Sequence, residues 1–222
     1  MTRVAVPDLA PKVKRQFQEA AMEFYTSPTS PYCRKVEVVL QETGLGDLVT
    51  RIDASGTPMA PNETTIGANP VGKIPVLIRE DGPALYDSRV ICRYLDASAG
   101  AKLYPESRVW DVLTLEATAD GVMDAALLMV YEGRLRAETE RSADWVEAQW
   151  IKVDRTLSAL ESRWMSHLSG PLNMGQIAVG CALGYLDFRH ADRDWQKSHV
   201  ALAGWWAEFS ARDSMAGTAP QG

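Results

Sequence analysis

The chain has 222 residues, of which 46% are hydrophobic, and a formal net charge of −6 at pH 7. This composition is globular, with room for one large or two small domains, and it excludes collagen-like and low-complexity classes. The acidic balance argues against a general nucleic-acid-binding protein. The three cysteines, Cys33, Cys92 and Cys181, lie too far apart in the chain for a disulfide framework or a metal-ligand spacing, so we expect no metal site.

The beginning of the chain does not resemble a targeting segment. Residues 1–20 lack the continuous apolar region and the small-residue cleavage site of a signal peptide, and we expect a short extension with some helical potential. No apolar run approaches the ~18 residues that a membrane span needs. These features predict a protein of the reducing cytoplasm that does not insert into a membrane.

The first structured residues alternate strand and helix signals. Residues 22–27 form a short β-prone run. Ser30 is a favourable N-cap and Pro31 suits the first helical position, so a helix should begin there and end near Gly44. Residues 47–53 predict a second strand. The pattern up to this point is therefore β-α-β.

A long connection separates this unit from the next elements. Residues 54–72 are rich in glycine, proline, alanine and asparagine and are expected to be mostly loop. Two apolar runs then flank Asp81-Gly82, which predicts a tight β-hairpin. Another helix should begin at Asp87 and Ser88. The predicted order in this part is β-β-α.

The pattern is helical from about residue 105 onward. Its strongest signal covers 142–164, where apolar residues recur in steps of four and three and Ser142 supplies an N-cap. Further helices are expected over 106–135, 174–189 and 199–212. We therefore expect an extension over 1–20, an α/β domain over 21–98 and an all-helical domain over 105–218.

Ser30 has two interpretations. Unpaired N–H groups and the helix dipole favour an anion at a helix N-terminus, and a serine there is most often only a cap. Its hydroxyl could also donate a hydrogen bond to a thiolate, which lowers the pKa of a thiol from about 8.5. In the second interpretation, Ser30 activates a thiol that arrives with a substrate.

Two other features point to a peptide-like ligand. Pro75 begins a predicted strand, either as an ordinary edge proline or through a cis Ile74–Pro75 bond that turns the Ile74 N–H and C=O toward a ligand. Asp87 and Ser88 form a plain cap, or a helix N-terminus that holds a ligand carboxylate.

These three segments together resemble the glutathione-binding, thioredoxin-like domain of cytosolic glutathione S-transferases. The segments are Ser30-Pro31-Tyr32-Cys33-Arg34, Asn69-Pro70-Val71-Gly72-Lys73-Ile74-Pro75, and Asp87-Ser88. Residues 116–132, 177–195 and 205–215 resemble the helices and the tail of a bacterial group of these enzymes. The resemblance implies a thioredoxin-like domain (βαβ–ββα) followed by a C-terminal all-helical domain.

The resemblance also implies roles for individual residues. In serine-type members the hydroxyl at the Ser30 position stabilises the glutathione thiolate, so Ser30 is the predicted catalytic residue, with Tyr25 as the rival in a tyrosine-type enzyme. The predicted glutathione-binding residues are Tyr32, Lys73, Ile74, Pro75, Asp87 and Ser88. A further family feature is a capping box in the helical domain, for which this chain has Asn173 and Gln176.

The implied function is a glutathione transferase that activates the glutathione thiol for attack on a small electrophile. Glutathione is then a co-substrate, no metal is needed, and the family implies a homodimer. Two alternatives stay open: a non-catalytic glutathione-binding carrier, and a monothiol reductase that uses Cys33. Because position 30 holds no partner sulfur, Cys33 cannot form the intramolecular disulfide of a dithiol enzyme.

Overall fold

The computed structural model describes residues 22–220. The chain divides into two compact units, one that ends at Tyr104 and one that spans Pro105–Pro220. The extension expected over residues 1–20 lies outside the described residues. Within 22–220, none of the helices is long and apolar enough to cross a lipid bilayer.

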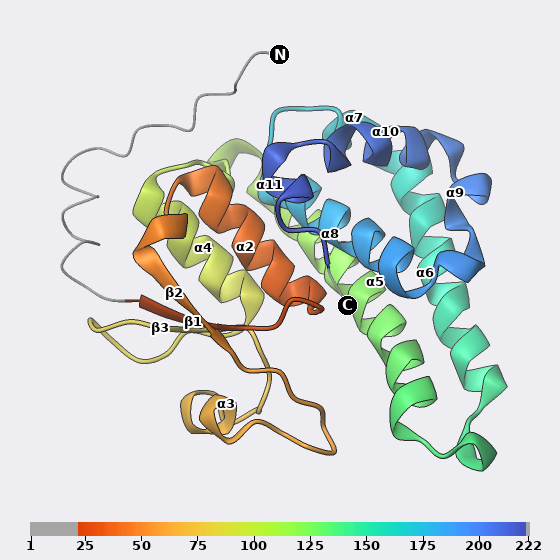
Figure 1. Cartoon of the computed structure of the whole chain (residues 1–222). Helices are drawn as coiled ribbons and strands as arrows, with labels where there is room; N and C mark the ends of the chain where they lie inside the picture. The colour runs from red at the N-terminus through yellow and green to blue at the C-terminus, as the bar shows by residue number, and fades with distance from the viewer. Residues whose placement is uncertain (1–21, 221–222) are drawn as a thin grey trace. The chain divides into compact units, whose positions relative to one another are not determined.

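The first unit is a three-stranded sheet with helices on both sides (Figure 1). The strand order is β2-β1-β3, with β1 parallel to β2 and antiparallel to β3. Helices α2 and α4 lie side by side on one face, and the short α3 lies on the other side. The elements are β1 (Met22–Thr26), α2 (Pro31–Thr43), η1 (Gly46–Leu48), β2 (Val49–Asp53), α3 (Glu63–Ala68), β3 (Val76–Ile78) and α4 (Ser88–Ala99). This is the predicted thioredoxin-like class.

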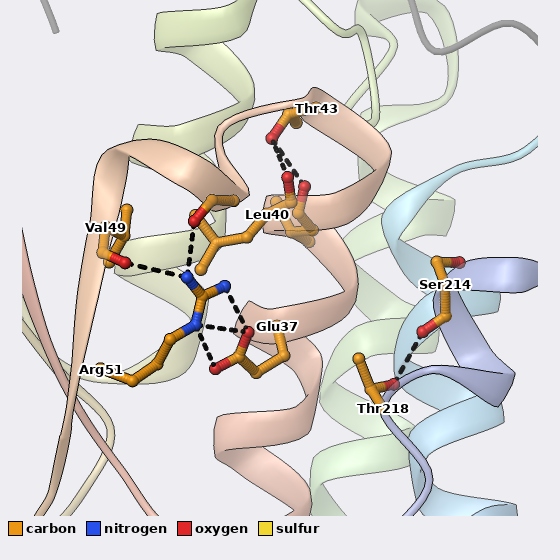
Figure 2. A network of polar contacts seen from close by, with 9 residues as sticks. Glu37, Leu40, Thr43, Val49, Arg51, Ser214 and Thr218 are labelled. Atoms are coloured by element: carbon orange, nitrogen blue, oxygen red, sulfur yellow. Dashed lines mark hydrogen bonds and ion pairs between the residues drawn. The ribbon is translucent and has the colours of Figure 1, made fainter. Parts of the chain in front are cut away.

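Local signals at both ends of α2 act as predicted. Ser30 is the N-cap and Gly44 ends the helix in the left-handed conformation at φ 69°, which glycine adopts without a steric penalty. Figure 2 shows how β2 is tied to this helix: Arg51 of β2 donates to Glu37 of α2 at 2.8 Å. Arg51 also donates within β2, to the Val49 carbonyl at 2.9 Å. The Thr43 hydroxyl donates to the Val39 carbonyl in the last turn.

The connecting segments agree with one expectation and differ from the other. Residues 54–72 are mostly loop, as predicted, but they include the short helix α3, with Asn62 as an N-cap that accepts from the Thr65 N–H at 3.1 Å. The tight hairpin predicted at Asp81-Gly82 is not formed. Leu77 and Leu85 bridge each other, but among the described residues this is a single bridge and the return segment is not a strand. Pro83, which has no N–H to donate, follows the glycine and prevents pairing next to the turn.

The second unit is entirely helical, as predicted. Helix α5 packs against both α6 and α8, and α8 is buried along nearly its whole length. Val153, Leu157 and Leu160 of the predicted apolar face of α6 are buried. The elements are η2 (Glu106–Arg108), α5 (Val109–Leu135), η3 (Glu138–Glu140), α6 (Ala143–Arg163), α7 (Met165–Leu168), α8 (Met174–Arg189), η4 (Ala191–Arg193), α9 (Trp195–Ser198), α10 (Val200–Ser210) and α11 (Asp213–Ala216).

The predicted capping box opens α8. The Asn173 side chain accepts from the N–H groups of Gly175 (2.9 Å) and Gln176 (3.4 Å), and the Gln176 side chain accepts from the Asn173 N–H at 2.7 Å. The structure also explains the glycine in the first turn. A Cβ at Gly175 would lie 2.8 Å from the Leu115 Cβ, so an alanine there would collide with α5. Close packing between α5 and α8 therefore requires this glycine.

Replacing Asn173 by alanine should destabilise the helical unit. The substitution leaves buried N–H groups without their acceptor, and the loss of an N-cap side chain costs about 1–2 kcal/mol. A thermal melt should show a decrease in Tm of roughly 2–8 °C for a chain of this size. An unchanged Tm would contradict the role of the box. Asn62→Ala, which removes the cap of the short α3, is the matched control and should change Tm less.

Candidate active site

The three segments singled out in the sequence come to one end of the sheet. Strand β1 ends next to the beginning of α2, and Tyr25 near that end pairs with Val76, the residue that follows Ile74-Pro75. Helices α2 and α4 begin at this same end (Figure 1). The Ser30 cap, the Ile74-Pro75 segment and the start of α4 therefore surround one edge of the α/β unit.

Ser30 has the geometry of a cap with a hydroxyl proton left to donate. Its Oγ accepts the Cys33 N–H at 3.3 Å, and its backbone N–H donates to the Ser27 carbonyl at 3.1 Å. A hydroxyl has one donor in addition to its acceptor sites, so the cap bond itself does not use the O–H, which lies within hydrogen-bonding reach of the Cys33 thiol. The residue is half-buried. The Ser30 side chain can therefore act both as the helix cap and as a donor to a thiolate.

The rival hydroxyl, Tyr25, faces the other side of the sheet. Side chains alternate along a strand, and the neighbouring Phe24 is fully buried in the core beneath the helices. Tyr25 is only half-buried and belongs to the opposite set of β1, with the exposed Glu23. Ser30 lies at the N-terminus of α2 itself, and this geometry favours it over Tyr25.

The loop before β3 presents Lys73, Ile74 and Pro75. The Ile74–Pro75 peptide bond is cis, which is the second of the two interpretations that the sequence left open. Asn69, which is buried, shapes this loop: its side chain donates to the Lys73 carbonyl at 2.7 Å and accepts from the Val71 N–H at 3.0 Å. Asn69 belongs to the motif identified in the sequence, but its role in shaping this loop was not predicted, although asparagine before proline is a turn signal.

Lys73 is exposed, Ile74 is half-buried and Pro75 is buried. Among the hydrogen bonds of residues 22–220, none comes from the N–H of Ile74. This donor at the open end of a sheet is a suitable partner for the main chain of a peptide ligand.

The start of α4 combines a buried serine with an exposed carboxylate. Ser88 is the first residue of the helix and is 2% exposed, while Asp87 caps it by accepting from the Arg89 N–H at 3.0 Å. Burial of Asp87 opposes ionisation, but the hydrogen bonds and charge of Arg89 and the charge of Lys35 outweigh it and lower the pKa of Asp87. Asp87 is therefore an anion that could hold an ammonium group, although part of its hydrogen-bonding capacity is already used by Arg89.

Cys33 is not an activated thiol. It lies in the first turn of α2 and is 1% exposed. Burial raises the pKa of its thiol to about 11, although hydrogen bonds to Ser30, Ser27 and Thr26 act in the opposite direction. A thiolate is the reactive form of cysteine, so this side chain is unreactive at neutral pH.

We expect Cys33 to resist alkylation in the folded protein. At pH 7.5 iodoacetamide should leave it unmodified over the time in which a small free thiol reacts completely. Because the pKa is raised, any reaction of the native protein should accelerate about tenfold per pH unit toward pH 11. Mass spectrometry of the native and urea-unfolded protein measures this difference. Rapid modification of native Cys33 at pH 7.5 would contradict the assignment.

The other predicted residues lie on the same segments. Tyr32 is half-buried in the first turn of α2, two residues after Ser30. Within residues 22–220, no three histidine, cysteine, aspartate or glutamate side chains are arranged to hold a metal ion. The chemistry that this edge offers is anion binding by two helix N-termini and main-chain pairing beside a cis-proline.

Comparison with known proteins identifies the family. Residues 29–98 match the glutathione S-transferase N-terminal domain, and residues 143–208 match the glutathione S-transferase C-terminal domain. The GST-like protein YibF of Escherichia coli is 31% identical over 204 residues, which cover 90% of this chain and 98% of that protein. The chain belongs to the glutathione S-transferase family.

Solved structures agree with this assignment. A glutathione transferase family member from Pseudomonas fluorescens with bound glutathione is 43% identical, with a TM-score of 0.88 over 90% of this chain and all of that one. A glutathione S-transferase from Methylobacillus flagellatus with bound glutathione is 38% identical, with a TM-score of 0.80 over the same shares. Both contain glutathione, the ligand class predicted from the sequence.

Proposed function

We propose that the protein is a glutathione transferase in which Ser30 stabilises the thiolate of bound glutathione. The observation that carries this proposal is the Ser30 hydroxyl, which caps α2 as an acceptor, so that the cap bond does not use its proton, and which lies at the same end of the sheet as Ile74-Pro75 and Ser88. When glutathione binds, this proton turns from the Cys33 thiol to the glutathione sulfur. The glutathione-bound relatives support the choice of ligand.

Five of the six predicted binding residues receive a role of their own, and Pro75 positions the main chain of Ile74. The Ile74 main chain pairs with the cysteinyl part of glutathione, and Lys73 neutralises the glycine carboxylate. The Ser88 N–H and hydroxyl hold the γ-glutamyl carboxylate at the start of α4, where the helix dipole favours an anion. Asp87 receives the γ-glutamyl ammonium group, and Tyr32 adds a contact from α2.

The reaction is a nucleophilic substitution or addition. The glutathione thiol loses its proton to solvent, and the resulting thiolate is held by the Ser30 hydroxyl and the N-terminus of α2. The sulfur then forms a bond to an electrophilic carbon of the second substrate. With an aryl halide, the carbon–halogen bond breaks and halide leaves with the electron pair.

Two alternatives predict different results. A reductase that works through Cys33 would need a thiolate at neutral pH, and the burial of this thiol disfavours it. A non-catalytic carrier would bind glutathione but would not accelerate its reaction. The homodimer and the cytoplasmic location stay predictions from the sequence.

The deciding experiment measures glutathione binding and turnover on the same sample. Calorimetry should detect glutathione binding, and absorbance should detect thioether formation with an activated aryl halide above the rate without protein. Binding without any acceleration over a panel of aryl halides, epoxides and enones would favour the carrier. Disulfide reduction that Cys33→Ser abolishes would favour the reductase.

A further inference from the structure

A pocket lies entirely within the helical unit. This pocket, of about 400 Å³, opens among α5, α6 and the end of α8. Three guanidinium groups line it, from Arg134 on α5, Arg189 at the end of α8 and Arg193 in η4. Its apolar wall is formed by Met129, Val130, Val146 and Phe188.

The three arginines are not equivalent. Arg193 is neutralised by Glu147, with 2.7 Å between Nη1 and Oε2, and it lies over the ring of Trp150. Among the described residues, neither Arg134 nor Arg189 has a carboxylate within ion-pair distance. Asp192 also lines the pocket. The three arginines therefore carry three positive charges, against two negative charges from Asp192 and from Glu147, the partner of Arg193. One positive charge is left in excess.

The unpaired arginines lie close to one another and at least one is held in position. Burial, followed by the neighbouring positive charge of Arg134, lowers the pKa of Arg189. Arg189 stacks on Phe188, with 3.9 Å from its central carbon to the ring centroid, and hydrogen-bonds Tyr185. Two neighbouring guanidinium groups repel each other unless an anion lies between them. Arginine also presents a planar pair of donors that matches a carboxylate.

His190 does not supply the missing charge. Its Nε2–H donates to the Ala126 carbonyl at 3.0 Å, and burial lowers its pKa, so the ring is neutral at pH 7. The positive charge of the pocket therefore comes from the arginines.

We infer that this pocket binds a small molecule with one carboxylate and an apolar body. Arg134 and Arg189 hold the carboxylate, and the wall of Met129, Val130, Val146 and Phe188 covers the apolar part. A monocarboxylate fits better than a phosphate dianion because the excess is a single positive charge. This site is formed by the helical unit alone and does not depend on the proposed role of Ser30.

Benzoate and benzamide form a matched pair of probes, since they share a ring and differ in charge. Calorimetry with the full-length protein without glutathione should detect benzoate and not benzamide. The double variant Arg134→Gln/Arg189→Gln should weaken benzoate binding more than about tenfold, because two charge-assisted hydrogen bonds are lost. Arg155→Gln/Arg163→Gln changes two exposed arginines of α6 outside the pocket by the same charge and should leave binding unchanged.

Each outcome decides the proposal. Equal benzoate affinity in the wild type and in Arg134→Gln/Arg189→Gln, with both proteins folded by circular dichroism, would overturn it. So would equal affinity for benzoate and benzamide, tighter binding of inorganic phosphate, or displacement of benzoate by glutathione. Benzoate binding that is retained in Ser30→Ala would separate this pocket from the proposed transferase mechanism. Loss of benzoate binding in Ser30→Ala would overturn the assignment of the pocket as an independent site.

Discussion

Replacing Ser30 by alanine should lower glutathione-dependent turnover about 100-fold while the protein stays folded. In the proposed mechanism the variant loses the hydroxyl that donates to the glutathione thiolate, and removal of a single preorganised donor to an anionic centre typically costs 10²- to 10³-fold in rate. Glutathione binding itself should weaken much less, because Ile74, Ser88 and the helix N-termini are retained. Steady-state kinetics and calorimetry on the same variant separate the two effects.

A matched control separates the loss of a helix cap from the loss of the thiolate donor. Ser30→Ala also deletes an N-cap, at a cost of about 1 kcal/mol. Ser142 caps α6 in the same way, with its Oγ accepting the Trp145 N–H at 3.2 Å. Ser142→Ala should therefore lower Tm by a similar amount and leave turnover unchanged. Equal turnover in Ser30→Ala and wild type would remove Ser30 from the mechanism.

The largest effect on stability is expected at Asp187, near the end of α8. One carboxylate oxygen accepts from the Trp195 indole at 2.8 Å and from the Gln196 side chain at 3.1 Å, and the other accepts from the Trp206 indole at 2.7 Å. Trp195 and Trp206 are buried, so Asp187→Ala leaves two indole N–H groups without an acceptor. Each such group costs about 1–3 kcal/mol.

We therefore expect Asp187→Ala to lower the free energy of unfolding by about 3 kcal/mol and Tm by roughly 6–12 °C. Urea denaturation followed by tryptophan fluorescence measures the change. Asp187→Asn keeps one carbonyl acceptor and should lose about half as much. A change below about 0.5 kcal/mol in Asp187→Ala, the range typical of surface positions, would contradict the role of this carboxylate as the link from α8 to α9 and α10.

The sequence could predict the parts of the fold that depend on neighbouring residues. The Ser30-Pro31 start of α2, the Gly44 stop and the Asn173–Gln176 box are all contained within a few positions, and the structure has each of them. The cis bond before Pro75 was one of two interpretations of the sequence, because proline is the residue for which this geometry is accessible, and the structure has it.

Features that depend on the tertiary structure were missed. Helix α3 is only six residues long, too short for apolar periodicity, and only Asn62 followed by Glu63 indicated its start. Asp187 meets its two tryptophans, and Arg134 its neighbour Arg189, only after the helical unit has folded. No local pattern marks such pairs.

The measurement that tests the central claim most directly is a pH titration of the thiolate absorbance of bound glutathione. For the wild type, the thiol pKa of bound glutathione should lie roughly one to two units below the ordinary value of about 8.5. In Ser30→Ala it should return most of the way to that value, and in Ser142→Ala it should stay low. An equal thiol pKa in the wild type and in Ser30→Ala would contradict the account.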